Sequence, residues 1–303
     1  MASEYDTVII GGGVSGFSAA MYAGRLKLKT LVIAEVKGGT LITTNDIRNW
    51  PGIKVTDGIS LAKQVEEHAM EYDIDLRQDK AVSLEAANSG YVVKTAKESF
   101  STKTVILATG TKVRKLKVPG EEEFSGKGVH YCALCDGFFY KDKVIAVVGG
   151  SDSAAKEAIL LTQWAKKVYI IYRKEKIRAE PFNLEAIEKN DNIEVINNTN
   201  ITEFLGGDNL TSVKLDKPYQ GKDELPLDGV FVEIGHIPLS ELGKQAGLKL
   251  NEKGEIVINR NAETSLPGIF AAGDVVDDKF KQAIVGSAEG VIAAYSAYEY
   301  LRK

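Results

Sequence analysis

A short apolar strand that runs into a glycine-rich turn and then a helix occurs twice in this chain. Near the start, Val8–Ile10 leads into the turn Gly11–Gly16, and a helical pattern follows over Phe17–Leu26. The second copy has the strand Val144–Val148, the turn Gly149–Ala154 and an alanine- and leucine-rich helix. A buried β-branched strand that turns at once into a helix is typical of a parallel nucleotide-binding unit. Two copies predict an α/β chain with two Rossmann-like domains.

The last part of the chain is better explained as a piece of the first domain than as a third domain. Ile256–Ile258 and Ile269–Ala271 have strand patterns, and a helical pattern covers about Ala283–Leu301. This is too little to bury a core of its own. The second domain is therefore predicted to be inserted into the first, with crossings near Thr111–Pro119 and Gly235–Leu242. The predicted domains are residues 1–113 with 240–303, and residues 114–239.

Composition limits the class of protein. The 303 residues, 44% apolar and 26% charged, predict a globular protein of two domains. The net charge of −4 gives no reason to expect a nucleic-acid or membrane surface. No apolar run approaches the ~20 residues of a membrane span. No charged segment leads into an apolar stretch with a cleavage site, so we expect no signal peptide and a cytoplasmic protein.

The two cysteines, Cys132 and Cys135, stand three positions apart. In a reducing compartment such a pair indicates redox chemistry or half of a metal site. A structural zinc site usually takes four Cys or His ligands, and the histidines at positions 68, 130 and 236 show no paired ligand spacing. We therefore predict a redox-active dithiol and no metal.

The first glycine-rich turn has the context of a dinucleotide-binding motif. Gly11 permits a tight turn, Gly13 lets the backbone approach a pyrophosphate, and Gly16 allows the helix to pack closely on the strand. The pyrophosphate is expected at the helix N-terminus, where backbone N–H groups favour anions. Glu35 ends the next strand, nineteen residues after Gly16, and can accept from ribose hydroxyls.

Four further segments resemble the signature segments of low-molecular-weight thioredoxin reductases. They are Asn49–Gly52, Ala108–Gly110, Cys132–Phe139 and Phe270–Asp274, and they occur in the family's order over nearly the whole chain. The C-x-x-C-D-G segment is the most specific, because glutathione-reductase-like enzymes carry the cysteines in the first domain. The resemblance implies an FAD-dependent disulfide oxidoreductase that reduces thioredoxin or a thioredoxin-like protein and forms a homodimer.

The resemblance also implies roles for single residues. Cys135 is expected to interact with the flavin, Cys132 to attack the partner's disulfide, and Asp136 to give and take protons. Capping of a helix start is a second role open to Asp136. The N-terminus of the last helix is expected to point at the flavin ring. The expected FAD site comprises Gly11, Gly12, Gly13, Val14, Ser15, Gly16, Glu35, Gly39, Thr40, Asn49, Ala108, Thr109, Gly110, Gly273, Asp274, Lys281, Gln282 and Ala283.

Two positions of the expected FAD site depart from the family. The family usually has glutamine where Thr40 stands, and arginine where Lys281 stands. Lysine keeps the positive charge but loses the planar fork of arginine. FAD is still the expected cofactor.

The second glycine motif departs further. The family has G-x-G-x-x-A, whereas this chain has Ser151 at the second glycine, between Gly149 and Ala154. The serine either obstructs the approach of a pyrophosphate or bonds a phosphate through its hydroxyl. The other expected NADPH contacts are Arg173, Lys174 and Arg178, of which Lys174 is a partial match. The donor therefore stays open between NADPH, the less favoured NADH, and a reduced flavin, deazaflavin or iron–sulfur protein.

Two other functions also stay open. One is a related dithiol flavoenzyme with a different donor or acceptor, and the other is a flavin-binding redox sensor that turns over slowly. Asp136 beside the cysteines favours an enzyme, because a sensor needs no proton relay to a leaving thiolate. His130, close to the dithiol, is interpreted as a structural histidine rather than a group that tunes a thiolate.

Overall fold

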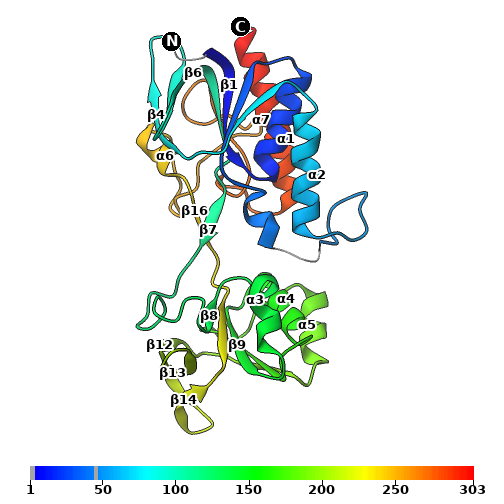
Figure 1. Cartoon of the computed structure of the whole chain (residues 1–303), viewed down its shortest axis with the longest axis vertical. Helices are drawn as coiled ribbons and strands as arrows, with labels where there is room; N and C mark the ends of the chain where they lie inside the picture. Colours follow the sequence, from blue (N-terminus) through cyan, green and yellow to red (C-terminus); the bar gives the residue numbers. More distant parts are fainter. Residues whose placement is uncertain (1–3, 44–46) are drawn as a thin grey trace. The chain divides into compact units, whose positions relative to one another are not determined.

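The computed structural model of the chain describes residues 4–43 and 47–303. The chain separates into two units (Figure 1). The discontinuous unit is Met1–Lys112 with Ile237–Lys303, and the inserted unit is Val113–His236. The chain crosses between the units in β7 (Thr111–Val113) and in β16 (His236–Pro238), two short strands that pair with each other. The predicted fold class, one Rossmann-like domain inserted into another, is confirmed.

A mostly parallel sheet forms the centre of the discontinuous unit. Its main path runs β3-β2-β1-β6-β5-β4, and β17 pairs with β6. β1, β2, β3, β6 and β17 pair in parallel, whereas β4 and β5 form an antiparallel hairpin. The strands are β1 (Glu4–Gly12), β2 (Thr30–Lys37), β3 (Ile74–Arg77), β4 (Ala81–Ala86), β5 (Tyr91–Thr95), β6 (Ser99–Leu107) and β17 (Ile269–Ala271).

Both faces of this sheet are buried. Along β1, Ile9 packs into one apolar cluster, whereas Val8 and Ile10 pack into another. Successive side chains of a strand point to opposite faces, so a strand covered on both sides must be apolar at every position. This explains the unbroken apolar run that predicted β1.

Helices cover one face of the sheet, where α1, α2 and α7 lie side by side (Figure 1). Ala19, Ala20 and Ala23 on α1 and Ala293 and Ala297 on α7 are fully buried in the same cluster. These small side chains allow the two helices to approach closely. The helical segments of the unit are α1 (Val14–Arg25), η1 (Gly39–Thr43), α2 (Gly58–Met70), α6 (Glu241–Gln245) and α7 (Ala283–Leu301).

The inserted unit has a parallel sheet in the order β11-β10-β9-β15-β8 and a separate antiparallel sheet in the order β12-β13-β14. The parallel strands are β8 (Val129–His130), β9 (Val144–Val148), β10 (Lys167–Ile171), β11 (Ile193–Ile196) and β15 (Gly229–Val232). The antiparallel strands are β12 (Ile201–Gly206), β13 (Leu210–Tyr219) and β14 (Lys222–Pro226). The helical segments are α3 (Ala133–Asp136), η2 (Gly137–Tyr140), α4 (Asp152–Leu161) and α5 (Pro181–Glu188).

The predicted strand at 256–258 is wrong. Ile256 forms only isolated bridges, to Leu250 and to Val276. The backbone N–H of Ile256 donates to Val275, that of Val257 donates to Lys249, and that of Ile258 donates to the side chain of Asp277. Because the backbone groups are divided between two neighbours, no continuous ladder forms.

Within the described residues, none of the helices combines the length and the apolar composition that spanning a bilayer requires.

Candidate active site

Cys132 and Cys135 are joined by a disulfide bond at the start of α3. Cys132 is the N-cap residue of this short helix, and its Sγ accepts from the backbone N–H of Cys135 at 3.1 Å. An N–H group directed at a sulfur stabilises the thiolate of that sulfur once the disulfide is opened. Cys132 is buried, whereas Cys135 is exposed. The hydrogen bond therefore favours Cys132 as nucleophile, while exposure favours Cys135.

Asp136 closes the same helix and contacts a buried histidine. Its Oδ2 lies 3.0 Å from Nδ1 of His130, and Nε2 of His130 lies 2.6 Å from the hydroxyl of Tyr140. The side chain of Asp136 is 31% exposed and that of His130 only 7%. The partly exposed carboxyl of Asp136, next to the dithiol in the chain, thus contacts the buried pair of His130 and Tyr140.

Two further carboxyls lie behind the dithiol helix. Glu157 on α4 accepts from the backbone N–H of Ala133 at 3.4 Å, and Glu233 follows β15. Burial raises the pKa of Glu233 to about 7. Burial and the neighbouring charge of Glu233 hold the pKa of Glu157 well above its usual range. The pair therefore holds at least one proton near neutral pH. The sequence carried no signal for this pair, because acids so far apart in the chain meet only through folding.

The first glycine turn has the packing that its spacing predicts. Gly11 has φ +127°, and a Cβ there would lie 2.0 Å from the backbone oxygen of Ala108. A Cβ on Gly16 would lie 2.0 Å from the backbone oxygen of Gly11. The atom nearest to a Cβ on Gly13 would be Cα of Gly39, at 3.9 Å. The fold itself therefore demands glycine at positions 11 and 16, whereas a Cβ at position 13 would make only an ordinary van der Waals contact.

Other chain segments meet this turn at the carboxyl ends of the parallel strands. A Cβ on Gly39, just after β2, would lie 3.2 Å from Cα of Gly13. A Cβ on Gly273, just after β17, would lie 2.3 Å from Oγ of Ser15. One on Gly286, in α7, would lie 2.5 Å from the same hydroxyl. The fold thus brings segments far apart in sequence to one edge of the sheet.

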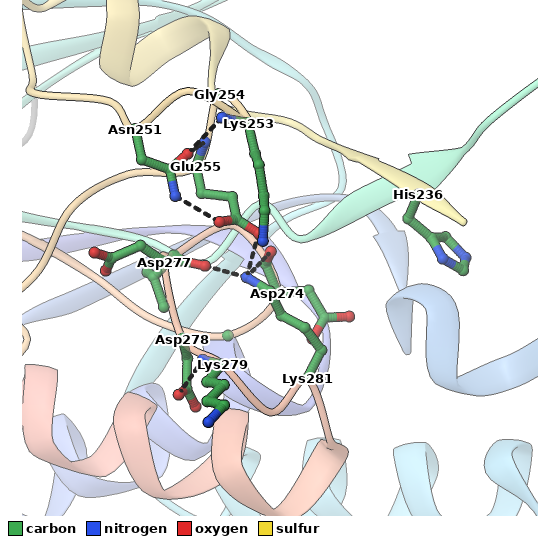
Figure 2. Close-up of polar contacts among 12 residues, drawn as sticks. His236, Asn251, Lys253, Gly254, Glu255, Asp274, Asp277, Asp278, Lys279 and Lys281 are labelled. Carbon is green, nitrogen blue, oxygen red and sulfur yellow. Dashed lines mark hydrogen bonds and ion pairs between the residues drawn. The ribbon is translucent and has the colours of Figure 1, made fainter. Parts of the chain in front are cut away.

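The start of α7 is connected to the segment of Asn49 and to the loop that carries Asp274. Nδ2 of Asn49 donates to Oε1 of Gln282, the N-cap residue of α7, at 2.9 Å. Figure 2 shows the ammonium of Lys281 beside Asp274 and Glu255. The Nζ atom donates to the backbone oxygens of Asp274, at 3.1 Å, and of Val276, and lies 3.1 Å from Oε1 of Glu255. The ammonium of Lys281 therefore binds groups of the protein itself and holds the loop that carries Asp274.

Comparison with known proteins places this arrangement in a family. A family model described as pyridine nucleotide-disulphide oxidoreductase matches residues 5–290. A thioredoxin reductase of Mycolicibacterium smegmatis is 40% identical over 98% of this chain and 96% of its own. The chain belongs to the thioredoxin reductase family.

Solved structures of the family agree. A crystal structure of Lactococcus lactis thioredoxin reductase is 35% identical, with a TM-score of 0.94 over 98% of this chain and 99% of that one. The structure of T. acidophilum thioredoxin reductase is also 35% identical, with a TM-score of 0.93 over 99% of both chains. The chain is thus a flavoprotein oxidoreductase of this family, as its sequence motifs predicted.

The residues of the discontinuous unit fit FAD, the cofactor of the thioredoxin reductase family. The N-terminus of α1 lacks a side-chain cap and has no acidic residue in its first turn, and the same holds for α7. The backbone N–H groups at these two helix starts can therefore bind anionic groups. A pyrophosphate suits the start of α1, and an anionic reduced flavin suits the start of α7. No protein atom crowds the Cβ position of Gly13, and its lack of a side chain admits the close backbone approach that a pyrophosphate requires.

Glu289 is a residue that sequence reasoning missed. It lies on α7, and its Oε2 accepts from the backbone N–H of Gly273 at 2.7 Å. Burial raises the pKa of Glu289 to about 7, and the nearby Asp278 adds to the effect. A carboxyl thus braces the glycine of the Gly273–Asp274 turn from behind. Its position in a helix, sixteen residues along the chain, offered no motif that could have revealed it.

Three more of the expected FAD residues lie at or just after the ends of β2 and β6. Glu35 lies near the end of β2 and is ion-paired with Lys80 at 3.1 Å, both side chains being largely exposed. Thr40 lies in η1. Thr109 donates through its hydroxyl to the backbone oxygen of Leu239 at 2.7 Å. The structure therefore gives Thr109 a structural bond at the entry to β7.

The second glycine motif of the inserted unit accepts serine without strain. A Cβ on Gly149 would lie 2.2 Å from the backbone oxygen of Glu233, and one on Gly150 would lie 2.4 Å from the ring of Tyr172. Ser151, by contrast, has extended backbone angles and an exposed side chain. Serine in place of the family's glycine at position 151 therefore introduces no backbone strain. Its effect is expected on ligand binding rather than on folding.

Proposed function

We propose that this enzyme reduces the disulfide of thioredoxin or of a small thioredoxin-like protein. The observation that carries the proposal is the Cys132–Cys135 disulfide beside Asp136, in a chain that belongs to the thioredoxin reductase family. A redox pair with an adjacent carboxyl that reaches solvent suits exchange with a protein disulfide.

FAD, when bound, supplies the two electrons that open the Cys132–Cys135 disulfide. The thiolate of Cys132 attacks one sulfur of the partner's disulfide. A mixed disulfide forms, and the partner's other sulfur leaves as a thiolate that takes a proton from Asp136. The hydrogen bond from the N–H of Cys135 to Sγ of Cys132 supports this choice of nucleophile.

The second half of the exchange returns the enzyme to its starting state. Asp136 removes the proton of Cys135, and the Cys135 thiolate attacks Sγ of Cys132. The Cys132–Cys135 bond forms again, and the partner's second sulfur leaves and takes the proton back from Asp136. The partner has then gained two electrons from the dithiol and two protons, one that Asp136 held at the start and one that came from Cys135 through Asp136. Asp136 ends ionised and takes up its proton again when the Cys132–Cys135 disulfide is next reduced.

The residues proposed to hold FAD lie in the discontinuous unit. The N–H groups that open α1 would receive the pyrophosphate, and Glu35 would accept from a ribose hydroxyl. Asp274 would bond the ribityl chain, and the start of α7 would face the flavin ring. Around these lie Gly39, Thr40, Asn49, Ala108, Thr109 and Gly110. Lys281 would act through the loop that carries Asp274.

The proposed electron donor is NADPH, bound by the inserted unit. Arg173, Lys174 and Arg178 are exposed beyond the end of β10, and cationic side chains there suit a 2′-phosphate. Ser151 opposes this assignment, because its side chain would stand near the approach of a pyrophosphate. A reduced flavin, a deazaflavin or an iron–sulfur protein is the competing donor.

An anaerobic titration of the purified flavoprotein tests the donor. Loss of the visible absorption of oxidised flavin at near-stoichiometric NADPH supports NADPH. Flavin that stays oxidised with NADPH and NADH, yet bleaches with dithionite, would move the search to the competing donors.

Trapping with cysteine variants tests the dithiol chemistry. Cys135→Ser is expected to accumulate a mixed disulfide between Cys132 and the partner, because the resolving thiol is missing. Cys132→Ser is expected to keep FAD and to lose reduction of the partner. Turnover of the partner by Cys132→Ser would overturn the assignment of the nucleophile.

The proposal includes a cytoplasmic homodimer. A dithiol that cycles needs a compartment that does not hold it permanently oxidised. Tyr295 and Ile292 on α7 have exposed fractions of 49% and 40%, which leaves apolar area for a second copy. Sedimentation analysis of the holoprotein distinguishes a dimer from a monomer.

A further inference from the structure

Asp136, the carboxyl beside the dithiol, is one end of a chain of three side chains. Its Oδ2 lies 3.0 Å from Nδ1 of His130, and Nε2 of the same ring lies 2.6 Å from the hydroxyl of Tyr140. The second contact is a hydrogen bond, and the first is a close polar contact between the imidazole and the carboxyl. All three residues belong to the inserted unit.

The fold fixes the ring of His130. The residue ends β8, in register with Phe231 of β15, and its ring stacks on that of Phe231 with centroids 5.3 Å apart and planes at 26°. The ring of Tyr140 meets it edge-on, at 5.4 Å and 75°. His130 is 7% exposed and Tyr140 is 9% exposed. A ring packed on two sides in this way cannot swing away when its partner changes charge.

A neutral imidazole has one donor and one acceptor nitrogen, so the chain can be satisfied in two ways. When Asp136 is ionised, Nδ1–H donates to the carboxylate and Nε2 accepts from the hydroxyl of Tyr140. When Asp136 is protonated, its O–H donates to Nδ1, and Nε2–H donates to the oxygen of Tyr140. In both states each nitrogen of the His130 ring has a partner, and a buried ring nitrogen without one would cost about 1–3 kcal/mol.

Tyr140 stays neutral throughout. Burial, and then the charges of Asp136 and Asp228, raise the pKa of Tyr140 to about 12. Asp228 is itself ion-paired with Lys143 at 3.2 Å. The phenol can therefore donate or accept at working pH without adding a charge to the chain. From β15, the ring of His130 meets the uncharged ring of Phe231.

We propose that His130 is a positioning residue for proton transfer at the dithiol: it holds Asp136 in place and exchanges its tautomer as Asp136 gains or loses a proton. This inference rests on the proposed function. A carboxyl that gives a proton to one thiolate and then takes one from another thiol needs a partner in both of its states. The Asp136–His130–Tyr140 chain supplies that support.

Nitrogen NMR of the holoprotein, with ¹⁵N-labelled histidine, reads the tautomer directly. The chain has only three histidines, so His68→Gln and His236→Gln assign the spectrum. We expect neutral His130 to carry its proton on Nδ1 at neutral pH. In Asp136→Asn the carboxylate charge that favours Nδ1–H is gone and the amide can also donate to Nδ1, so the Nε2–H tautomer is expected to gain population. Equal tautomer populations in both proteins would overturn the proposal.

Kinetics supply the second readout. His130→Gln is expected to lower kcat for partner reduction roughly tenfold, with a smaller change in KM, because positioning of an acid–base group affects the chemical step. The exposed His68 makes His68→Gln a matched control, which should leave the rate unchanged. An unaltered rate and pH profile in His130→Gln would contradict the proposal.

Tyr140→Phe covers the case in which His130→Gln does not fold. It keeps the contact between His130 and Asp136 but removes the partner of Nε2 in both states of Asp136. The ring is then held less firmly, so kcat for partner reduction should fall, with a smaller change in KM. A rate and pH profile identical to those of the wild type would count against the chain. If the wild type fails to reduce thioredoxin, the proposed function fails, and the tautomer experiment still decides the role of His130.

Discussion

The ammonium of Lys281 lies 3.1 Å from Oε1 of Glu255, and the two residues come from segments on either side of the Asp274 loop. Glu255 is 8% exposed and also accepts from Nδ2 of Asn251 at 2.6 Å. Burial raises the pKa of Glu255, yet the bonds from Asn251 and Lys281 outweigh burial and hold the pKa below its usual range. Because Lys281 also bonds two carbonyl oxygens of the loop, the pair braces the turn proposed to bind the ribityl chain (Figure 2).

Lys281→Met is expected to lower the free energy of unfolding by about 2 kcal/mol, because it strands the buried charge of Glu255. FAD retention should fall with it. Chemical denaturation and flavin content after gel filtration measure the two effects. The double variant with Glu255→Gln removes the stranded charge, so it should be more stable than Lys281→Met alone. A double variant that is less stable would show that the pair does not act as a unit.

Gly13→Ala and Gly16→Ala should separate binding from folding. A Cβ added at position 13 meets no protein atom closer than 3.9 Å, so Gly13→Ala should fold normally but bind FAD at least about tenfold more weakly. A Cβ added at position 16 lies 2.0 Å from a backbone oxygen, so Gly16→Ala should lose about 3 kcal/mol of stability. Thermal unfolding and flavin titration test both. Equal FAD binding by wild type and Gly13→Ala would contradict a pyrophosphate at this turn.

Ser151→Gly should improve use of NADPH. The change restores the family's glycine, and at an uncapped N-cap position it should cost only a few tenths of a kcal/mol of stability. Relief of about 0.7 kcal/mol would lower KM for NADPH roughly threefold with kcat unchanged. Ser151→Ala is the matched control, because it removes the hydroxyl but keeps the Cβ. A higher KM in both variants would show instead that the hydroxyl bonds a phosphate.

Glu289→Gln should change the pH dependence of stability. The folded protein raises the pKa of Glu289 from about 4.5 to about 7, so it binds this proton more tightly than the unfolded chain does. The resulting stability is complete below about pH 4.5 and is lost as the pH rises through 7. The neutral glutamine avoids that loss, so the variant should be more stable than the wild type above pH 7, by on the order of 1 kcal/mol after screening by water. Denaturation at about pH 5 and about pH 8 compares the two, and a constant difference would argue against titration of Glu289.

Local pattern was sufficient for the repeated β-turn-α units and for the dithiol. The unbroken apolar runs at 8–10 and 144–148 predicted strands buried on both faces, because a strand with one face in water alternates apolar and polar residues. The structure has strands at both places. The strand predicted at 256–258 from the same kind of pattern is wrong. Its composition matches a strand, but pairing depends on which neighbours the fold supplies, and here the backbone bonds are split between two segments.

The sequence predicted those site residues that lie together in one turn or one short helix. Gly11, Gly13 and Gly16 act within one turn, and Cys132, Cys135 and Asp136 act within one short helix. Because the residues of each motif lie in one local element, their spacing along the chain fixes how they are arranged in space.

The sequence by itself determined the two nucleotide-type units, the redox pair and the family, because each rests on contacts between residues a few positions apart. Only the tertiary structure decided that His130 contacts Asp136, that Glu289 accepts from the backbone of Gly273 and that Lys281 is ion-paired with Glu255. These partners come from different strands, helices and loops. Hydrogen bonds and ion pairs act over about 3 Å, so no pattern along the chain reveals them until folding brings the groups together.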